Sequence, residues 1–214
     1  MFVAVRLDAA ELADWCRQQL GAEPVATLFE SGHLSRVLGV RLADGRQVVL
    51  KVRPPAERLA ACFAVQRHLW QAGFPCPEPL AGPAPLGRLS ATAEAYLPGG
   101  AWEPATPATL PELSARGLAQ LTRAAPPSKD VGPLEPPPPW FGYGQAGPTL
   151  WPELPPDDPH GNLQLQTEAW IDDAARRARA RLAACRLDPV IGHCDWHGEN
   201  VRWASDRLHA VHDW

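Results

Sequence analysis

The sequence predicts an α+β fold, with strands gathered in the first hundred residues and helices dominating the rest. Apolar residues recur at every second position in three short stretches, 25–29, 37–42 and 48–52, which is the period of a half-buried strand. The period changes to that of a helix over 110–123 and again over 167–187. We therefore expect a small antiparallel sheet followed by a mostly helical region.

The composition and net charge of the chain indicate which kinds of partner to expect. The 214 residues are 45% hydrophobic and 21% charged, and the net charge is −4. So mild a charge argues against nucleic acid or an anionic membrane as the main partner. No apolar run reaches the length of a membrane span. The five cysteines are odd in number and lack paired spacing, and no signal peptide precedes them, so we expect reduced thiols and a cytoplasmic protein.

The first hundred residues contain the expected sheet. Residues 9–20 have helical spacing, and the three strands follow, with a tight turn at Asp44-Gly45 between the last two. A small polar loop, 30–36, connects the first two strands. Ser31 and Gly32 in this loop would let backbone amides approach phosphate groups. The loop is not a Walker loop, because no Gly-Lys-Ser/Thr sequence follows it.

A second helix and a hairpin come next. Pro54-Pro55 are expected to open a helix over 56–71. The prolines that follow it force an extended path into the next strand, and residues 88–97 would form the returning strand.

Residues 126–159 are rich in proline and have neither a helical nor a strand period. We interpret them as a surface insertion; a proline-rich ligand for a binding module is the alternative. In the helix over 167–187 we expect the arginines to face solvent and an apolar stripe to be buried. That stripe consists of Trp170, Ile171, Ala174, Ala178, Leu182 and Cys185.

The stretch from His193 to Asn200 contains most of the candidate catalytic and metal-binding residues. Asp195 and Asn200 lie five residues apart on a predicted loop, and Asp213 follows thirteen residues after Asn200. This set suits phosphoryl transfer. The first carboxylate accepts the proton of an attacking hydroxyl, while the amide oxygen and the second carboxylate hold magnesium on the nucleotide phosphates. The pattern His-x-Asp-x-x-x-x-Asn, followed by Asp-Trp, resembles the aminoglycoside phosphotransferase and choline kinase-like family, small-molecule relatives of the protein kinases.

The resemblance implies a two-lobed, protein-kinase-like fold. Residues 1–97 would form the nucleotide-binding lobe. Residues 98–214 would form a partial helical lobe that contains the insertion (126–159) and the catalytic loop (193–200). The implied reaction moves the γ-phosphoryl group of ATP or GTP to a hydroxyl of a small molecule, with Mg²⁺ as cofactor. Asp195 would be the catalytic base and Asn200 and Asp213 the magnesium ligands, while His193 would be a structural hydrogen-bonding residue.

The resemblance also assigns the nucleotide contacts. Lys51, one of two lysines against 18 arginines, ends the third strand, where the family has its phosphate-contacting lysine. Ser31 and Gly32 would lie beside the phosphates. Tyr96 and Leu97, at the expected hinge between the lobes, would lie beside the adenine, although core packing explains these two residues equally well.

One departure from the family concerns the acidic partner of Lys51. In the family a glutamate near the middle of the following helix pairs with this lysine. Here the middle of that helix offers Cys62 and Gln66, and its one acid is Glu57 in the first turn. We expect either that Glu57 reaches Lys51 from the helix end or that a weaker amide contact replaces the ion pair.

Two other classes of function stay open. A zinc or iron hydrolase could use His193, Asp195 and His197. A non-catalytic nucleotide-binding remnant is the second, because the family's larger lobe continues beyond the metal-binding aspartate and we interpret this chain as truncated there. The acceptor also stays open among aminoglycosides, macrolides, choline-like amino alcohols and sugars, as do ATP versus GTP and the oligomeric state.

Overall fold

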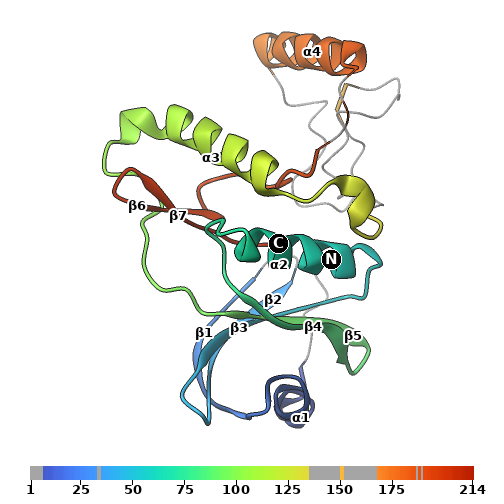
Figure 1. Ribbon diagram of the computed structural model, residues 1–214, viewed down its shortest axis with the longest axis vertical. Coiled ribbons are helices and arrows are strands. Elements are labelled where there is room, and N and C mark those ends of the chain that lie inside the picture. Colours follow the sequence, from blue (N-terminus) through green and yellow to red (C-terminus); the bar gives the residue numbers. More distant parts are fainter. Residues whose placement is uncertain (1–6, 33–34, 135–149, 152–167, 187, 189) are drawn as a thin grey trace. The chain divides into compact units, whose positions relative to one another are not determined.

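The computed structural model of the chain describes residues 7–32, 35–134, 150–151, 168–186, 188 and 190–214 (Figure 1). The chain divides into two compact units. One consists of residues 2–135 together with 190–214, and the other of residues 136–189. The predicted division into lobes at 1–97 and 98–214 stays a prediction.

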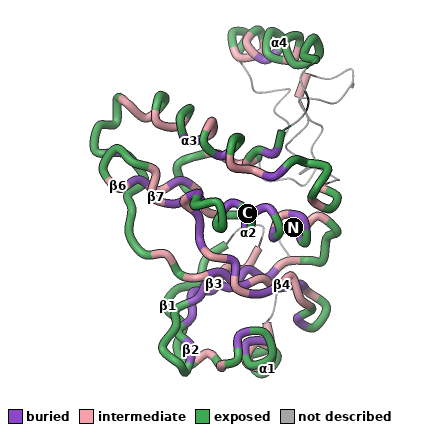
Figure 2. The backbone as a smooth tube through the Cα atoms, in the orientation of Figure 1, coloured by how far each residue is buried: buried purple, intermediate pink, exposed green. Residues whose placement is uncertain are grey.

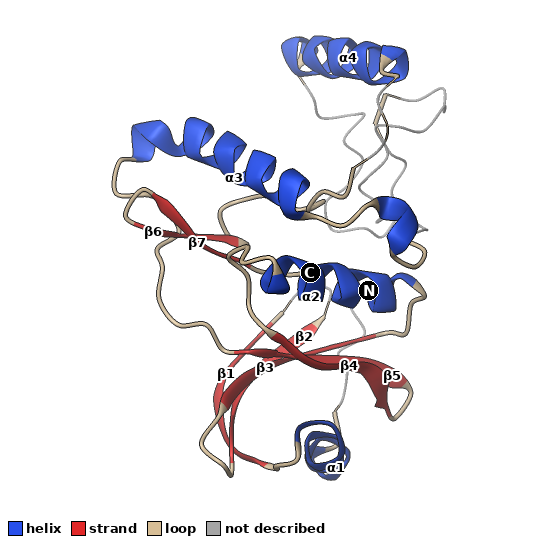
Figure 3. Ribbon diagram, viewed as in Figure 1, coloured by secondary structure: helices blue, strands red, loops and turns tan. Residues whose placement is uncertain are grey.

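The first unit is built on a five-stranded antiparallel sheet (Figure 3). Its strands stand in the spatial order β1-β2-β3-β5-β4. Their bounds are β1 (Pro24–Ser31), β2 (Arg36–Leu42), β3 (Gln47–Arg53), β4 (Pro79–Leu86) and β5 (Leu89–Ala95). The three strands predicted from the period of two are therefore confirmed, with bounds extended by one or two residues.

The strand β3 lies in the middle of the sheet and is buried on both faces (Figure 2). Val48, Leu50 and Val52 point to one face, where they join a core with helix α1 (Ala9–Leu20). Alternation places Lys51 on the opposite face, the one that helix α2 (Arg58–Gln71) covers. A central strand buried on both sides thus carries a charged residue in its interior.

The helix α1 has the two caps that its sequence favours. The Asp8 carboxylate accepts hydrogen bonds from the backbone N–H groups of Ala10 and Glu11, and Gly21 ends the helix in the left-handed conformation. The helix α2 begins at Arg58, slightly later than predicted, and ends at Gln71 as predicted.

A second core joins α2 to the C-terminal part of this unit. Val65 and Leu69 of α2 pack with Leu121 of helix α3 (Leu110–Ala124), with Ile191 and with Val211. Val211 belongs to a hairpin of β6 (Val201–Ala204) and β7 (Arg207–Val211). Short 3₁₀ turns lie at Pro107–Thr109 and Ser128–Asp130. This core holds the loop that precedes β6 against the helices.

The second unit contains α4 (Ala169–Ala184), a shorter helix than the one predicted over 167–187. The expected burial of its apolar stripe is wrong. Trp170 is 65% exposed and Leu182 is 56% exposed, and Ala175 is the buried residue of the helix. The physical reason is that amphipathic spacing makes a face available without supplying a partner, and within the described part of its own unit α4 has no helix or strand to pack on.

Most of the predicted insertion at 126–159 lies outside the described residues. Within the part of the chain that the structure describes, no helix is long and apolar enough to cross a membrane.

Candidate active site

The loop from Ile191 to Asn200 is held at its start and near its middle. Ile191 is buried in the second core, and the side chain of Trp196 packs on Gly117 of α3. A Cβ atom at Gly117 would lie 2.8 Å from Cζ2 of Trp196, so the absence of a side chain there makes the contact possible. Asp195 immediately precedes Trp196, so this packing fixes where the Asp195 backbone lies.

His193 supports the loop through both nitrogens of its ring. The backbone N–H of Asp195 donates to Nδ1 at 3.3 Å, which places the ring proton on Nε2. Nε2 in turn donates to the carbonyl oxygen of His212 at 2.8 Å. Burial lowers the pKa of His193 and so favours this neutral form. Neither nitrogen is left to bind a metal.

The structure brings Asp195 and Asn200 together. The amide Nδ2 of Asn200 donates to the Asp195 carboxylate Oδ2 at 2.9 Å and to the Asp195 carbonyl oxygen at 3.0 Å. The amide oxygen of Asn200 therefore points away from Asp195. It is the atom of this side chain suited to a hard cation.

His197 also contacts Asp195. From the sequence we gave His197 no role in phosphoryl transfer. Its Nε2 lies 3.1 Å from the Asp195 Oδ1. The Glu199 backbone N–H donates to its Nδ1 at 3.2 Å, so the ring proton sits on Nε2. The spacing of two residues was visible in the sequence, but it does not reveal which way the ring faces. The Asp195 side chain stays 46% exposed and is reachable by a substrate.

The acidic partner of Lys51 differs from both expectations. Lys51 Nζ lies 3.2 Å from Oε1 of Glu94, and both side chains are buried. Neither Glu57 nor a direct amide contact fills this role. Glu94 comes from β5, which adjoins β3 in the sheet, whereas α2 contributes Gln66, whose Nε2 donates to Oε2 of Glu94 at 2.9 Å. Strand adjacency brings Glu94 to Lys51, and the linear sequence does not contain that adjacency.

Lys51 also faces the C-terminal aspartate. Its Nζ lies 3.8 Å from Oδ1 of Asp213, whose side chain is about half exposed. Although Glu94 is within ion-pairing distance, the Lys51 ammonium makes no well-formed hydrogen bond to any described residue. Its N–H groups are therefore available to an anionic ligand, because a buried donor gains most from a partner of opposite charge.

The backbone of Asp213 is unusual. Its φ of 61° lies in the left-handed region that residues other than glycine seldom adopt. The neighbouring contacts hold it there: the backbone N–H of His212 donates to the carbonyl oxygen of Asn200 at 2.8 Å, and Val211 donates to that of Pro75 at 2.9 Å. Burial lowers the pKa of His212 to about 4, so its ring is neutral beside the Lys51 charge.

The remaining predicted residues lie at strand ends. Ser31 pairs with Val37, and Val37 pairs with Lys51, so Ser31 and Lys51 occupy one row across the sheet and their side chains share a face. Gly32 has a φ of 128°, and a Cβ there would lie 1.9 Å from the Ser35 carbonyl oxygen, so glycine is required.

Tyr96 and Leu97 follow β5 directly. The Tyr96 ring lies 6.0 Å from the ring of Phe29 on β1, a residue that the sequence did not single out. Both aromatic rings are partly exposed. They form an apolar surface at the strand ends on which a flat ligand could lie.

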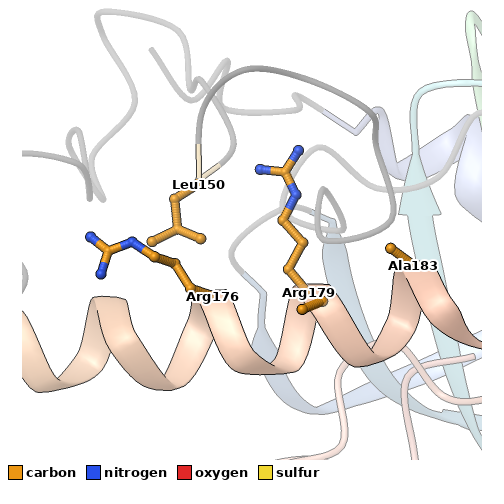
Figure 4. A pocket seen from close by; sticks show the side chains of 5 residues that line it. Leu150, Arg176, Arg179 and Ala183 are labelled. Carbon is orange, nitrogen blue, oxygen red and sulfur yellow. The ribbon is translucent and has the colours of Figure 1, made fainter.

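Other chemistry finds less support. Among the residues with described positions, no group of three or more His, Cys, Asp or Glu side chains could hold a metal ion. The occupied nitrogens of His193 leave the zinc or iron hydrolase without one of the three ligands that it would use. A shallow hollow of about 450 Å³ in the second unit is lined by Leu150, Arg176, Arg179, Ala180 and Ala183 and contains none of the predicted site residues (Figure 4).

The fold is that of the kinase-like phosphotransferases, which confirms the predicted fold class. Residues 25–214 match the model of the phosphotransferase enzyme family, and the chain belongs to that family. No curated protein matches the chain.

Solved structures of known kinases resemble the chain at low sequence identity. A thermostable mutant of aminoglycoside phosphotransferase APH(4)-Ia, in ternary complex with ADP and hygromycin B, has a TM-score of 0.56 and 19% identity, over 95% of this chain and 70% of that one. Amicoumacin kinase hAmiN, in complex with AMP-PNP, Ca²⁺ and Ami, has a TM-score of 0.56 and 13% identity, over 95% of this chain and 64% of that one. A putative fructosamine-3-kinase from Thermobifida fusca YX-ER1 has a TM-score of 0.50 and 19% identity, over 94% of this chain and 72% of that one.

Proposed function

We propose that the chain transfers the γ-phosphoryl group of ATP or GTP to a hydroxyl of a small molecule, with Mg²⁺ as cofactor. The observation that carries the proposal is the meeting, in one compact unit, of a reachable carboxylate held by an amide and a buried lysine beside a second carboxylate. The first set is Asp195 with Asn200, and the second is Lys51 with Asp213. Membership of the phosphotransferase family supports the reaction class.

The residues present fit a magnesium nucleotide. The Asn200 amide oxygen and the Asp213 carboxylate are oxygen donors of the kind that Mg²⁺ prefers. The Lys51 ammonium, buried and without a well-formed hydrogen bond among described residues, suits a phosphate oxygen. Bound magnesium would neutralise charge on the phosphates during transfer.

Asp195 would orient the acceptor and take its proton. A hydrogen bond from Asn200 holds the carboxylate, the His197 ring lies beside it, and its exposed side admits the acceptor hydroxyl. As the acceptor oxygen forms its bond to the γ-phosphorus, the bond from that phosphorus to the bridging oxygen breaks. The hydroxyl proton passes to the Asp195 carboxylate. A positioned base of this kind contributes roughly 10²–10⁴-fold to the rate.

The acceptor would be a hydroxyl-bearing small molecule. The APH(4)-Ia structure contains hygromycin B, so aminoglycoside-like compounds are the first acceptors to assay on this chain.

Calorimetry with a non-hydrolysable ATP analogue tests the proposal. Binding should require Mg²⁺ and should be lost in Lys51→Ala and in Asp213→Ala. The first variant removes the positive charge that would meet the phosphates, and the second removes a carboxylate that would hold the Mg²⁺. Lys129→Ala, which changes the chain's other, exposed lysine, is the matched control and should bind as the unaltered chain does. Affinity that is unchanged in both Lys51→Ala and Asp213→Ala would refute the proposal.

A further inference from the structure

Three buried polar side chains form a cluster, and the proposed reaction gives a role to one of them, Lys51. Lys51, Glu94 and Gln66 are each 5% exposed or less. Glu94 stands at the centre, with one carboxylate oxygen 3.2 Å from the lysine ammonium and the other accepting from the glutamine amide at 2.9 Å. A buried charge without a partner is costly, so the charges of Lys51 and Glu94 depend on each other.

The sheet determines the geometry of this pair. In the β3–β5 ladder Val49 stands opposite Glu94 and Lys51 opposite Thr92. Lys51 lies two residues along β3 from Val49, so Lys51 and Glu94 are diagonal neighbours on one face of adjacent strands. Backbone hydrogen bonds of the ladder set their separation, and a shift of α2 would leave those bonds intact.

The helix α2 contributes a neutral group. Gln66 Nε2 donates to Glu94 at 2.9 Å and to the Pro77 carbonyl oxygen at 3.0 Å, which uses both hydrogens of the amide. Pro77 lies on the segment that leads into β4. Gln66 therefore fixes the rotamer of Glu94 and ties it to the chain between α2 and the sheet.

We infer that Glu94 is the positioning residue that holds Lys51 for the nucleotide phosphates, and that it acts from within the sheet. Other kinase-like enzymes place the acid on the helix, so the lysine is set only when the helix is docked. In this chain the charged pair is complete within β3 and β5, and α2 supports it only through the Gln66 amide. This inference rests on the proposed function, because it concerns how Lys51 meets phosphate.

A series of variants that remove or relocate the carboxylate charge tests the assignment of Glu94 as the positioning residue. Glu94→Gln removes the charge and keeps the shape, and it should weaken binding of a magnesium ATP analogue about tenfold or more. That change corresponds to the loss of one well-placed charged contact. Glu57→Gln, which removes the exposed acid immediately before α2, is the matched control and should leave affinity unchanged.

The double variant Gln66→Glu/Glu94→Gln moves the acid from the strand to the helix. It should bind the analogue as weakly as Glu94→Gln does, because residue 66 contacts residue 94 and the Pro77 carbonyl oxygen rather than Lys51. Recovery of the lost affinity would show that an acid on the helix serves equally well, and it would overturn the assignment to the strand. Adenosine, which lacks the phosphates, should bind Glu94→Gln as tightly as it binds the unaltered chain.

Urea unfolding without nucleotide gives a second readout. Lys51→Met and Glu94→Gln should each lower the free energy of unfolding. The combined variant Lys51→Met/Glu94→Gln should lower it by less than the sum of these two losses. Additive losses, or a Glu94→Gln variant that binds the ATP analogue as the unaltered chain does, would overturn the inference. Failure of the proposed function would give a different result. The unaltered chain would then bind no nucleotide, even if the unfolding data show that Lys51 and Glu94 are energetically coupled.

Discussion

The contact between Gly117 and Trp196 allows the most direct test of how the site is held. Gly117→Ala would place a Cβ atom 2.8 Å from Cζ2 of Trp196, closer than carbon atoms can approach, and 3.2 Å from Cη2, which is also tighter than an ordinary contact. Both ring atoms belong to a rigid indole, so the tryptophan must move as a unit. Asp195 precedes it in the chain, and the loop from Ile191 to Asn200 would move with it.

Two effects on stability oppose each other in this variant. Alanine in place of glycine in a helix interior favours folding by about 1 kcal/mol. Overpacking of a buried contact costs about 1–3 kcal/mol. The steric term should win, so we expect the free energy of unfolding to fall by about 1 kcal/mol. Turnover should fall far more, because a displacement of about 1 Å at a reacting group costs on the order of 10²-fold.

Urea unfolding and turnover are measured for four proteins: the unaltered chain, Gly117→Ala, Trp196→Phe and the double variant. A phenyl ring lacks the atoms that clash, so the double variant should be more stable than the sum of the single changes predicts, by about 0.5–3 kcal/mol. Ala115→Gly, at an exposed position of α3, calibrates the helix term and should cost about 1 kcal/mol. A Gly117→Ala protein that is more stable than the unaltered chain and turns over normally would refute the reasoning.

Three further predictions concern the base and the thiols. Asp195→Asn should lower turnover by roughly 10²–10⁴-fold while nucleotide affinity, measured by calorimetry, stays within about twofold, because the base acts on the acceptor; full turnover would contradict the assignment. At pH 8 a thiol reagent should label the exposed Cys185 in the native chain and Cys16 and Cys76 only after unfolding, and rapid native labelling of Cys76 would show that its burial is wrong. Burial raises the pKa of Cys16 from 9.0 to about 11, so as the pH climbs above 9 the unfolded chain loses this proton first and stability falls towards pH 11. Cys16→Ala should make that fall shallower in urea titrations, and an identical slope would count against it.

The loop from Ile191 to Asn200 shows how far short-range pattern can go. The spacing of Asp195, Asn200 and Asp213 is a local property, and a loop followed by a two-stranded hairpin leaves few ways to arrange it. The three strands at 24–53 could likewise be predicted locally, because a period of two indicates a strand whatever the order of strands in the sheet. The left-handed Gly21 and the Asp8 cap were likewise visible in the sequence because capping depends on immediate neighbours.

Long-range neighbours were decided by the tertiary structure alone. The sequence alone, read through the family pattern, placed the acid for Lys51 on the following helix, whereas the spatial order of the sheet sets β5 beside β3 and delivers Glu94. The apolar stripe of α4 predicted burial, yet Trp170 is largely exposed. Periodicity reports which face of an element is apolar, but which element covers that face depends on strand order and on packing between segments distant in sequence. Short-range spacing therefore determined the residues suited to chemistry in this protein, and the pairing of β3 with β5 decided which of them hold one another in place.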